Sequence, residues 1–279
     1  IADRFIYMKK GKIVREFSSV EIQKLPAKEL MSMGLRNLSY DELEIQNYNE
    51  AKTFMRIHDF IFQYKGSKKL SLSIDELDIP KASVIAIIGR NGAGKSTFVR
   101  CLCGLEKKAK GLLEDSNVML KAKKRLNNSF LVMQDVNRQL FTESVEEEII
   151  LSMYEGKNDL LEEILKEFDL YEYRKQHPMS LSGGQKQRVA VASAIASARD
   201  YIIFDEPTSG LDYFHMQQVA DCVKKLQEKD KTIFLITHDI ELVYSCCNYV
   251  LQIENGMVKE LYQLNGKNES RLRNFFRAI

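Results

Sequence analysis

The stretch Gly89–Thr97, which reads GRNGAGKST, constrains the fold of this chain more than any other feature. It fits the phosphate-binding loop pattern G-x-x-x-x-G-K-[ST], whose backbone N–H groups surround an anion. An apolar, β-branched run, Val84–Ile88, precedes the loop and predicts a buried parallel strand. The run that follows, Lys95–Leu105, is compatible with a helix. Strand, loop and helix in this order predict an α/β nucleotide-binding fold and argue against a mere glycine-rich turn.

We expect the whole loop to contact the phosphates of a nucleotide. Lys95 should reach the β- and γ-phosphates, and the Ser96 hydroxyl should ligate Mg²⁺. The N-terminus of the following helix adds partial positive charge at the same place. The expected contact residues are Gly89, Arg90, Asn91, Gly92, Ala93, Gly94, Lys95, Ser96 and Thr97.

Composition places the chain among soluble globular proteins with a real core, since 44% of its 279 residues are hydrophobic and 29% charged. The net charge of +2 gives no global sign of binding to nucleic acid or an anionic membrane. No apolar run approaches the roughly 18–20 residues that span a bilayer, so a role at a membrane would need a partner. The five cysteines form no C-x-x-C pair, and we expect them reduced and mostly buried.

Strands that alternate with helices predict a mainly parallel sheet with helices on both faces. Two alternating runs before the loop, Met55–Phe62 and Leu70–Ile79, predict further half-buried strands, and Leu112–Asn128 has no clear pattern. Ligands of such sheets bind at the carboxyl ends of the strands. Four predicted strands end at or just before Ile88, Gln134, Asp205 and His238. These positions should therefore lie together at the carboxyl edge of the sheet.

Two further motifs show which nucleotide-binding family the chain resembles. They are LSGGQ at Leu181–Gln185 and FDEPTSGLD at Phe204–Asp212. With the phosphate loop and His238, they resemble the nucleotide-binding domain of ABC-type ATPases from roughly Thr53 to the end. The resemblance implies a P-loop ABC-type ATPase fold with a mainly parallel core sheet, an antiparallel β subdomain and a helical insertion at about residues 142–195. It also implies ATP and Mg²⁺ as cofactors.

The resemblance implies a role for each motif residue. Gln134 matches the glutamine that contacts Mg²⁺ and water, and Asp205 the Mg²⁺-associated aspartate. Glu206 matches the general base, and His238 the histidine that contacts the γ-phosphate. Tyr64 lies where the family places an aromatic that stacks on adenine, an interaction worth about 1–3 kcal/mol. A tyrosine in a turn is the competing interpretation, and Phe62 is an alternative stacking residue.

In this family the LSGGQ motif serves the site of a second ABC domain. The motif residues here are Ser182, Gly183, Gly184 and Gln185, at the start of a predicted helix, where they would form a second anion site. Ser209–Asp212, including the site residue Asp212, matches the loop that crosses the interface between the two domains. The resemblance therefore implies a head-to-tail partner, either a copy of this chain or a sister domain.

A narrower resemblance lies between Gln134 and Glu148. Gln139–Phe141, followed by Val145 and Glu148, resembles the corresponding region of cobalt and energy-coupling-factor importer ATPases, although Val136 replaces the usual proline. It implies import of vitamins or transition-metal ions through transmembrane subunits. The chain would then be cytoplasmic and peripheral on the inner face of the membrane. Gln139 and Phe141 could instead simply pack the helical insertion.

Two other functions compete with transport. One is a non-transport ABC ATPase that acts on nucleic acid or ribosomes, but no sustained heptads lie between the phosphate loop and LSGGQ. The other is a nucleotide-binding module that barely hydrolyses, which the intact Glu206 and His238 argue against. We therefore expect ATP hydrolysis coupled to transport, with no nucleic acid partner.

The N-terminal residues indicate a tandem arrangement. Residues 1–14 alternate apolar and polar, turn at Lys10–Gly11, and match Cys246–Lys259 with Gly11 on Gly256. The first residue is Ile rather than Met. We expect residues 1–17 to be the final hairpin of a preceding ABC domain and residues 18–51 a linker with a helical stretch around Ala27–Met33. Residues 52–279 should be the ABC ATPase domain. An N-terminal extension particular to this protein is the alternative.

Overall fold

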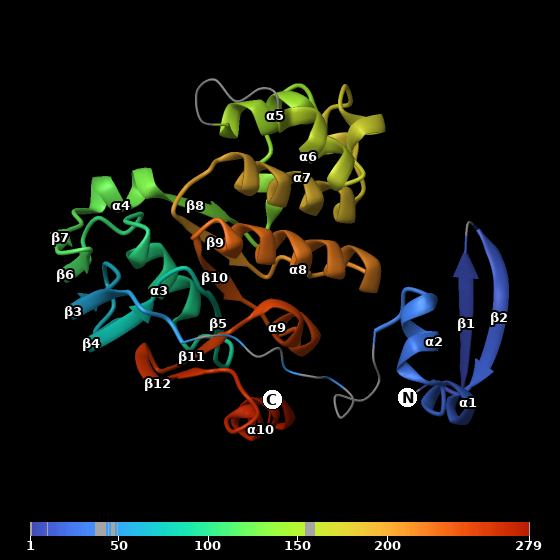
Figure 1. The fold of residues 1–279 in the computed structure, drawn as a ribbon, viewed down its shortest axis with the longest axis horizontal. Helices are drawn as coiled ribbons and strands as arrows, with labels where there is room; N and C mark the ends of the chain where they lie inside the picture. The colour runs from blue at the N-terminus through green and yellow to red at the C-terminus, as the bar shows by residue number, and fades with distance from the viewer. Residues whose placement is uncertain are drawn as a thin grey trace.

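The computed structural model describes residues 2–9, 11–36, 43, 45, 48, 50–153 and 160–278. Part of the expected linker, residues 37–42, 44, 46, 47 and 49, lies outside the described residues. The described chain forms an N-terminal unit, residues 2–36, and a main body, residues 50–153 and 160–278. Figure 1 shows the N-terminal unit beside the main body, with α8 and α9 between it and the central sheet.

The main body is built on a six-stranded, mainly parallel sheet, as the sequence predicted. The strand order is β12-β11-β5-β10-β9-β8, in which only β12 runs antiparallel to its neighbour. The strands are β5 (Val84–Ile88), β8 (Ser129–Val132), β9 (Tyr201–Asp205), β10 (Thr232–Ile236), β11 (Tyr249–Glu254) and β12 (Met257–Gln263).

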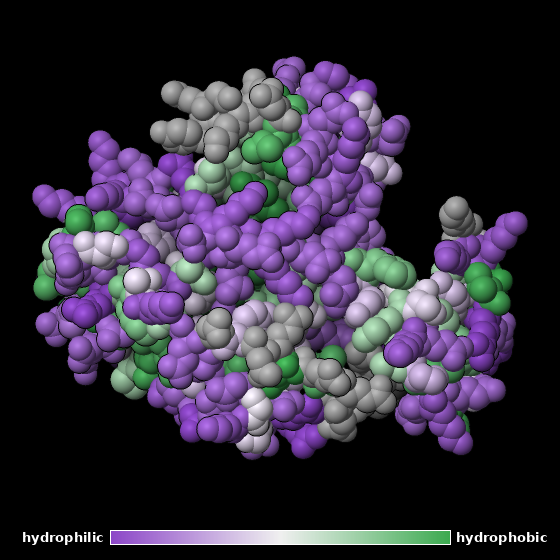
Figure 2. Space-filling model, viewed as in Figure 1, coloured by the Kyte–Doolittle hydropathy of each residue, from purple (hydrophilic) through white to green (hydrophobic). Residues whose placement is uncertain are grey.

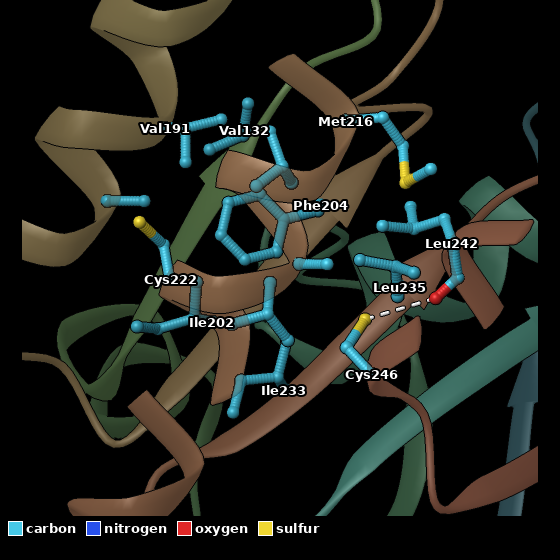
Figure 3. Close-up of a cluster of buried hydrophobic side chains, with 14 of the residues drawn as sticks. Val132, Val191, Ile202, Phe204, Met216, Cys222, Ile233, Leu235, Leu242 and Cys246 are labelled. Carbon is cyan, nitrogen blue, oxygen red and sulfur yellow. Dashed lines mark hydrogen bonds between the residues drawn. The ribbon is translucent and has the colours of Figure 1, made fainter. Parts of the chain in front are cut away.

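Both faces of this sheet are buried at its four central strands, β11, β5, β10 and β9, because these are apolar at consecutive positions. All five residues of β5 are buried. Val84, Ala86 and Ile88 belong to a cluster with the helical insertion, whereas Ile85 and Ile87 belong to a second cluster with the antiparallel sheet. Figure 3 shows Phe204 of β9 inside the first cluster. Burial of such a side chain stabilises the fold by about 2–3 kcal/mol.

The second cluster lies under an antiparallel sheet of order β4-β3-β6-β7. The alternation predicted before the phosphate loop is confirmed in β3 (Phe54–Phe62), which buries every second residue over most of its length. The other strands are β4 (Leu72–Pro80), β6 (Lys110–Asp115) and β7 (Val118–Met119). The stretch without a clear pattern thus holds the end of β6, all of β7 and α4 (Ala122–Asn128).

Helices cover the rest of the main body. The insertion consists of α5 (Val145–Ser152), α6 (Leu161–Glu167) and α7 (Gly183–Ala196), drawn together in Figure 1. The others are α3 (Lys95–Leu102), α8 (Tyr213–Glu228), α9 (Ile240–Cys246) and α10 (Glu269–Arg277). In the described parts of the chain, 3₁₀ turns lie at Val136–Arg138, Tyr171–Tyr173 and Pro178–Ser180. Within the described chain, every helix is too short or too polar to traverse a bilayer. The five cysteines are free and buried, as predicted.

The N-terminal unit is a hairpin with two short helices packed on it. The hairpin is β1 (Arg4–Lys9) and β2 (Lys12–Ser18), and the helices are α1 (Ser19–Gln23) and α2 (Ala27–Ser32). Phe17, Ile22 and Leu30 form a small core between them. The expected linker therefore begins with helices that pack on the hairpin, because β2 and both helices each supply one buried apolar residue.

The β1–β2 hairpin has the same register as β11–β12. Arg4 pairs with Ser18 as Tyr249 does with Gln263, and both hairpins end in a turn with a left-handed glycine, φ 74° at Gly11 and 75° at Gly256. Their register shifts also coincide, at Tyr7/Met8 and Gln252/Ile253. The alignment of Gly11 with Gly256 is thus confirmed. The two strands also begin at equivalent positions, β1 at Arg4 and β11 at Tyr249.

The two hairpins differ in what covers them. Ile6 and Met8 of β1 are 51% and 58% exposed, whereas their counterparts Leu251 and Ile253 are 0% and 1% exposed. The counterparts are buried because β11 pairs with β5 and belongs to the central sheet. Apolar surface is visible over the hairpin at the right of Figure 2.

Candidate functional site

The phosphate loop joins β5 to α3 through backbone conformations that favour glycine. Gly94 caps α3 with φ of 106°, and Gly89 has φ of 157°. A Cβ on Gly89 would lie 2.3 Å from the carbonyl oxygen of Ile253 in β11. The Gly256 N–H donates a hydrogen bond of 2.8 Å to the carbonyl of Ala93. The loop is therefore supported from behind by the β11–β12 hairpin.

Lys95, at the start of α3, turns its ammonium group back into the loop. Its Nζ donates to the carbonyl oxygens of Gly89 at 2.7 Å and Arg90 at 3.3 Å. The residue is only 8% exposed, and this burial lowers the pKa of its amine, while Glu206 and Asp205 oppose that shift. A buried cation held by loop carbonyls can exchange these acceptors for the oxygens of a phosphate group.

Two carboxylates stand at the carboxyl end of β9, opposite Lys95. Asp205 accepts a hydrogen bond from the Ser96 side chain, and Glu206 accepts one of 3.4 Å from the His238 backbone N–H. Burial raises the pKa of both carboxyl groups above their ordinary values. Glu206 is also held in a left-handed conformation, φ 53°, by a 2.9 Å hydrogen bond from its N–H to the carbonyl of Ile236.

His238 follows β10 and completes the group of charges. Its Nε2 lies 3.4 Å from the Lys95 Nζ and 3.5 Å from a carboxylate oxygen of Glu206. Burial and, to a smaller extent, the Lys95 cation lower the pKa of its imidazole. Both effects favour the neutral form of the ring.

These side chains surround one hollow of about 480 Å³ at the carboxyl edge of the sheet. An anion that enters it would meet the loop N–H groups and Lys95 on one side, and the carboxylates on the other. Mg²⁺ prefers oxygen ligands and keeps places for substrate phosphates, which fits the Ser96 hydroxyl, Asp205 and Gln134 on this wall. The lining residues are Asn91, Gly92, Ala93, Gly94, Lys95, Ser96, Thr97, Gln134, Asp205, Glu206, Ser209, Ile236 and His238.

The LSGGQ residues are not part of this lining. Ser182 caps α7: its Oγ accepts from the Gln185 N–H at 3.3 Å, and the Gln185 side chain accepts from the Ser182 N–H at 2.8 Å. Ser182 and Gly183 are exposed. Asp212, another expected contact, caps α8 through the His215 N–H and also lies outside the lining.

Tyr64 lies beside the phosphate loop, as expected of a residue that stacks on a base. Its hydroxyl is 3.3 Å from the Thr97 hydroxyl, and the residue is 42% exposed. The ring packs edge to face on Phe62, with centroids 4.7 Å apart. Phe62 is 4% exposed, so of these two rings Tyr64 is the one accessible to a ligand.

Sequence reasoning missed three residues that brace this site. Asp239, next to His238, accepts a hydrogen bond of 2.9 Å from the Thr208 hydroxyl and caps α9 through the Leu242 N–H. Arg36, from the N-terminal unit, forms an ion pair of 2.8 Å with the same aspartate. Asp before an apolar helical run could have revealed the cap. No motif could have revealed Arg36, which is far away in the sequence.

Comparisons with known proteins identify the family. A family model described as ABC transporter matches residues 72–209. A Treponema denticola protein named as an ABC transporter ATP-binding protein is 38% identical over 268 residues, which are 94% of this chain and 55% of that protein. The energy-coupling factor transporter ATP-binding protein EcfA1 of Mycoplasmopsis pulmonis is 37% identical over 198 residues, 67% of this chain and 74% of that protein. This chain belongs to the ABC transporter ATP-binding family.

A solved ABC structure agrees with the fold. The dimeric post-hydrolysis state of an ATP-binding cassette bound to ADP and Pi is 27% identical and has a TM-score of 0.66. The match covers 76% of this chain and 99% of that one. The part that matches here is thus an ABC-type ATPase domain. The chain spans about half the length of the curated Treponema relative that it matches.

The charge arrangement predicts how His238 of this ABC domain titrates. In the protein without nucleotide, the pKa of the His238 imidazole should lie below its ordinary value. Lys95→Met should raise that pKa partway, because it removes the cation 3.4 Å away but leaves the burial. NMR titration of the ring proton measures this shift. Lys259→Met is the matched control, since Lys259 pairs with Glu254 instead. Equal titration of His238 in Lys95→Met and the unsubstituted protein would contradict the prediction.

Proposed function

We propose that this chain binds Mg·ATP, hydrolyses it at an interface with a second ABC domain, and thereby powers transport by a membrane partner. The observation that carries the proposal is the convergence of Lys95, Asp205, Glu206 and His238 on one hollow, without the LSGGQ residues. Such a hollow holds the groups that bind and activate a γ-phosphate but lacks a cap. The exposed cap of α7 can supply one to another domain.

Lys95 and the loop bind the phosphates in this mechanism. Lys95 leaves the Gly89 carbonyl for the β- and γ-phosphate oxygens, and the loop N–H groups donate to the same anion. Ser96, Asp205 and Gln134 would hold Mg²⁺, which neutralises charge that develops on the transferred phosphoryl group. Most of the rate acceleration then comes from positioning and electrostatic stabilisation.

Glu206 activates the attacking water. Its carboxylate is held by the His238 backbone and lines the hollow, and its raised pKa makes it a stronger base than an exposed glutamate. The His238 ring can contact a γ-phosphate oxygen, since its Nε2 lies 3.4 Å from the Lys95 Nζ, which binds the same phosphate in this mechanism. In this mechanism Glu206 accepts the proton of the attacking water, and His238 orients the γ-phosphate.

The reaction needs a second ABC domain. Ser182–Gln185 begin α7 with exposed residues and an N-terminus that carries partial positive charge. Ser209 lines the hollow, and the loop from Ser209 to Asp212 leads away from it to α8. A head-to-tail pair would place the α7 start of one domain over the hollow of the other. The solved neighbour with ADP and Pi is itself described as a dimer.

Glu206→Gln tests the chemistry and the pairing together. The variant should bind ATP as well as the unsubstituted protein, lose turnover at least about a hundredfold, and accumulate an ATP-bound dimer, because Gln cannot accept the proton. Steady-state phosphate release and sedimentation with ATP measure these outcomes. Lys95→Ala is the contrasting variant and should lose ATP binding itself. Turnover by Glu206→Gln at the normal rate would remove Glu206 from the mechanism.

The helical insertion supplies the surface for the membrane partner. Phe141 is 73% exposed, and its backbone N–H donates to the buried Glu148 carboxylate, which also accepts from Thr142. An apolar ring on a braced turn is suited to a hydrophobic socket on another protein. We infer that the partner is a transmembrane subunit of a vitamin or metal-ion importer, a view supported by the EcfA1 relative. The chain would lie on the cytoplasmic face of the membrane, and no observation here favours a nucleic acid or ribosome partner.

Phe141 offers a test of this docking surface. Phe141→Ala should lower the fraction of the protein that co-purifies with membranes by about tenfold, because truncation of a central aromatic contact typically costs 1–2 kcal/mol or more. Quantitative immunoblotting of washed membranes from the native host measures that fraction. Phe54→Ala, which removes a ring that is 44% exposed on β3, is the control. Equal recovery of both variants would contradict a docking role for Phe141.

We also propose that the N-terminal hairpin completes a preceding ABC domain in the same protein. Its register equals that of β11–β12, yet the residues that β11 buries against the central sheet are exposed in β1. A second central sheet would cover them, with β1 in parallel beside its phosphate-loop strand as β11 lies beside β5. A protein with two ABC domains also agrees with the length of the Treponema relative.

The gene gives a direct check of the tandem arrangement. The reading frame upstream of Ile1 should encode a second phosphate loop and an LSGGQ-like motif, because both belong to the sheet that the hairpin would complete. Sequencing that region measures it. The phosphate loop and the LSGGQ motif of this chain, within residues 89–185, serve as the reference for the spacing between the two motifs. An upstream frame without an ABC domain would make the hairpin an extension particular to this protein.

A further inference from the structure

Arg36 stands where the N-terminal unit meets the main body. It follows α2 and Gly34, whose carbonyl oxygen accepts a hydrogen bond of 3.0 Å from the N–H of Tyr213 at the start of α8. The side chain of Arg36 extends from this contact to the loops that carry His238 and Leu211. It is therefore a residue of one unit that enters the functional site of the other.

The Arg36 guanidinium joins three separate partners. It lies 2.8 Å from the Asp239 carboxylate and 3.1 Å from the Glu241 carboxylate, and it contacts the carbonyl oxygen of Leu211 at 3.5 Å. The side chains of Glu241 and Asp239 are only 6% and 18% exposed, and that of Arg36 is 30% exposed. Charges this far from solvent interact more strongly than surface pairs, so the bridge constrains all three positions.

Asp239 connects Arg36 to the two side chains proposed for hydrolysis, Glu206 and His238. The carboxylate oxygen that Arg36 contacts also accepts from the Thr208 hydroxyl at 2.9 Å, so it ties together the loops after β9 and β10. Asp239 adjoins His238, whose backbone N–H donates to Glu206. Arg36, Glu206, Ser209 and His238 line one hollow of about 330 Å³. The bridge thus sets how His238 and Glu206 lie relative to the Ser209–Asp212 loop.

We propose that Arg36 is a positioning residue for ATP hydrolysis, through which the N-terminal unit controls turnover without contact with the nucleotide. It acts on Glu206 and His238 through Asp239, and on the expected interface loop through Leu211. When the N-terminal unit is docked on the main body, Arg36 supports the site. When the unit moves away, this support is lost and hydrolysis slows. The inference rests on the roles proposed for Glu206 and His238.

Arg36→Ala in the full-length protein tests the inference. The kcat for ATP hydrolysis should fall about tenfold, whereas the KM for ATP should stay within about twofold, because Lys95 and the phosphate loop are untouched. Arg36→Lys should recover part of the kcat, since a lysine can still pair with Asp239. Arg15→Ala is the matched control: Arg15 belongs to the same unit but pairs with Glu29 inside it.

A double-mutant cycle shows whether Arg36 acts through Asp239. Asp239→Asn keeps the cap on α9 but removes the charge that Arg36 contacts. The double variant should therefore be no slower than the slower single variant. If the fold-loss of kcat in the double variant equals the product of the losses in the two single variants, Arg36 acts by another route, and the inference is overturned.

Hydrogen exchange gives a readout that needs no turnover. Arg36→Ala should speed exchange in peptides that cover residues 206–212 and 237–242, and Arg15→Ala should not. Unchanged kcat and exchange in Arg36→Ala would overturn the inference, as would equal losses in both arginine variants. Glu206→Gln is assayed beside them. Normal turnover in Glu206→Gln would refute the proposed site. If Glu206→Gln is inactive and Arg36→Ala has normal turnover, only the role of Arg36 is refuted.

Discussion

The phosphate loop keeps its shape because the C-terminal hairpin approaches it too closely for any side chain at Gly89. A Cβ there would meet the carbonyl oxygen of Ile253 at 2.3 Å, and the turn at Gly256 donates a hydrogen bond to Ala93. The hairpin turn is itself placed by β4, since the Ser73 N–H donates to the carbonyl of Gly256. The antiparallel sheet, the hairpin and the loop therefore form one chain of contacts, which supports the loop that precedes Lys95.

The electrostatics of the site follow from burial of opposite charges in one place. Burial shifts the pKa of each of four side chains in the direction that favours its neutral form: it lowers the pKa of Lys95 and His238 and raises the pKa of Asp205 and Glu206. The ammonium and the carboxylates counteract these shifts in one another, so the group is balanced without a ligand. A polyphosphate with Mg²⁺ would add negative charge beside Lys95 and positive charge beside the carboxylates.

The sequence predicted the central sheet and singled out Lys95, Asp205, Glu206 and His238, which the structure brings to one hollow, because the features that identify them are local. A fixed spacing defines the phosphate loop, and apolar runs that end in Asp205 or His238 define strand ends. The register of the N-terminal hairpin was also predictable, since the alignment of Gly11 with Gly256 depends on a short repeat. The Arg36 bridge was not, because a contact across roughly two hundred residues of chain leaves no periodic signal. The packing of α1 and α2 on the hairpin was not predictable for a similar reason, since only three buried apolar residues specify it, although a helix around α2 was expected.

Comparison of the two hairpins shows that burial is a property of context and not of sequence pattern. Both have alternating apolar residues, the same turn and the same register shift, but only β11 has a neighbour in a larger sheet. In the N-terminal hairpin, α1 and α2 cover one face through Phe17, Ile22 and Leu30, and Ile6 and Met8 stay exposed on β1. An edge strand with exposed apolar residues and unpaired backbone groups favours addition of another strand. The same unit carries Arg36 at its other end, so any strand that pairs with β1 would also fix the orientation from which Arg36 reaches Asp239. Pairing at the hairpin edge and the geometry at His238 would in this way be linked through the N-terminal unit, residues 2–36.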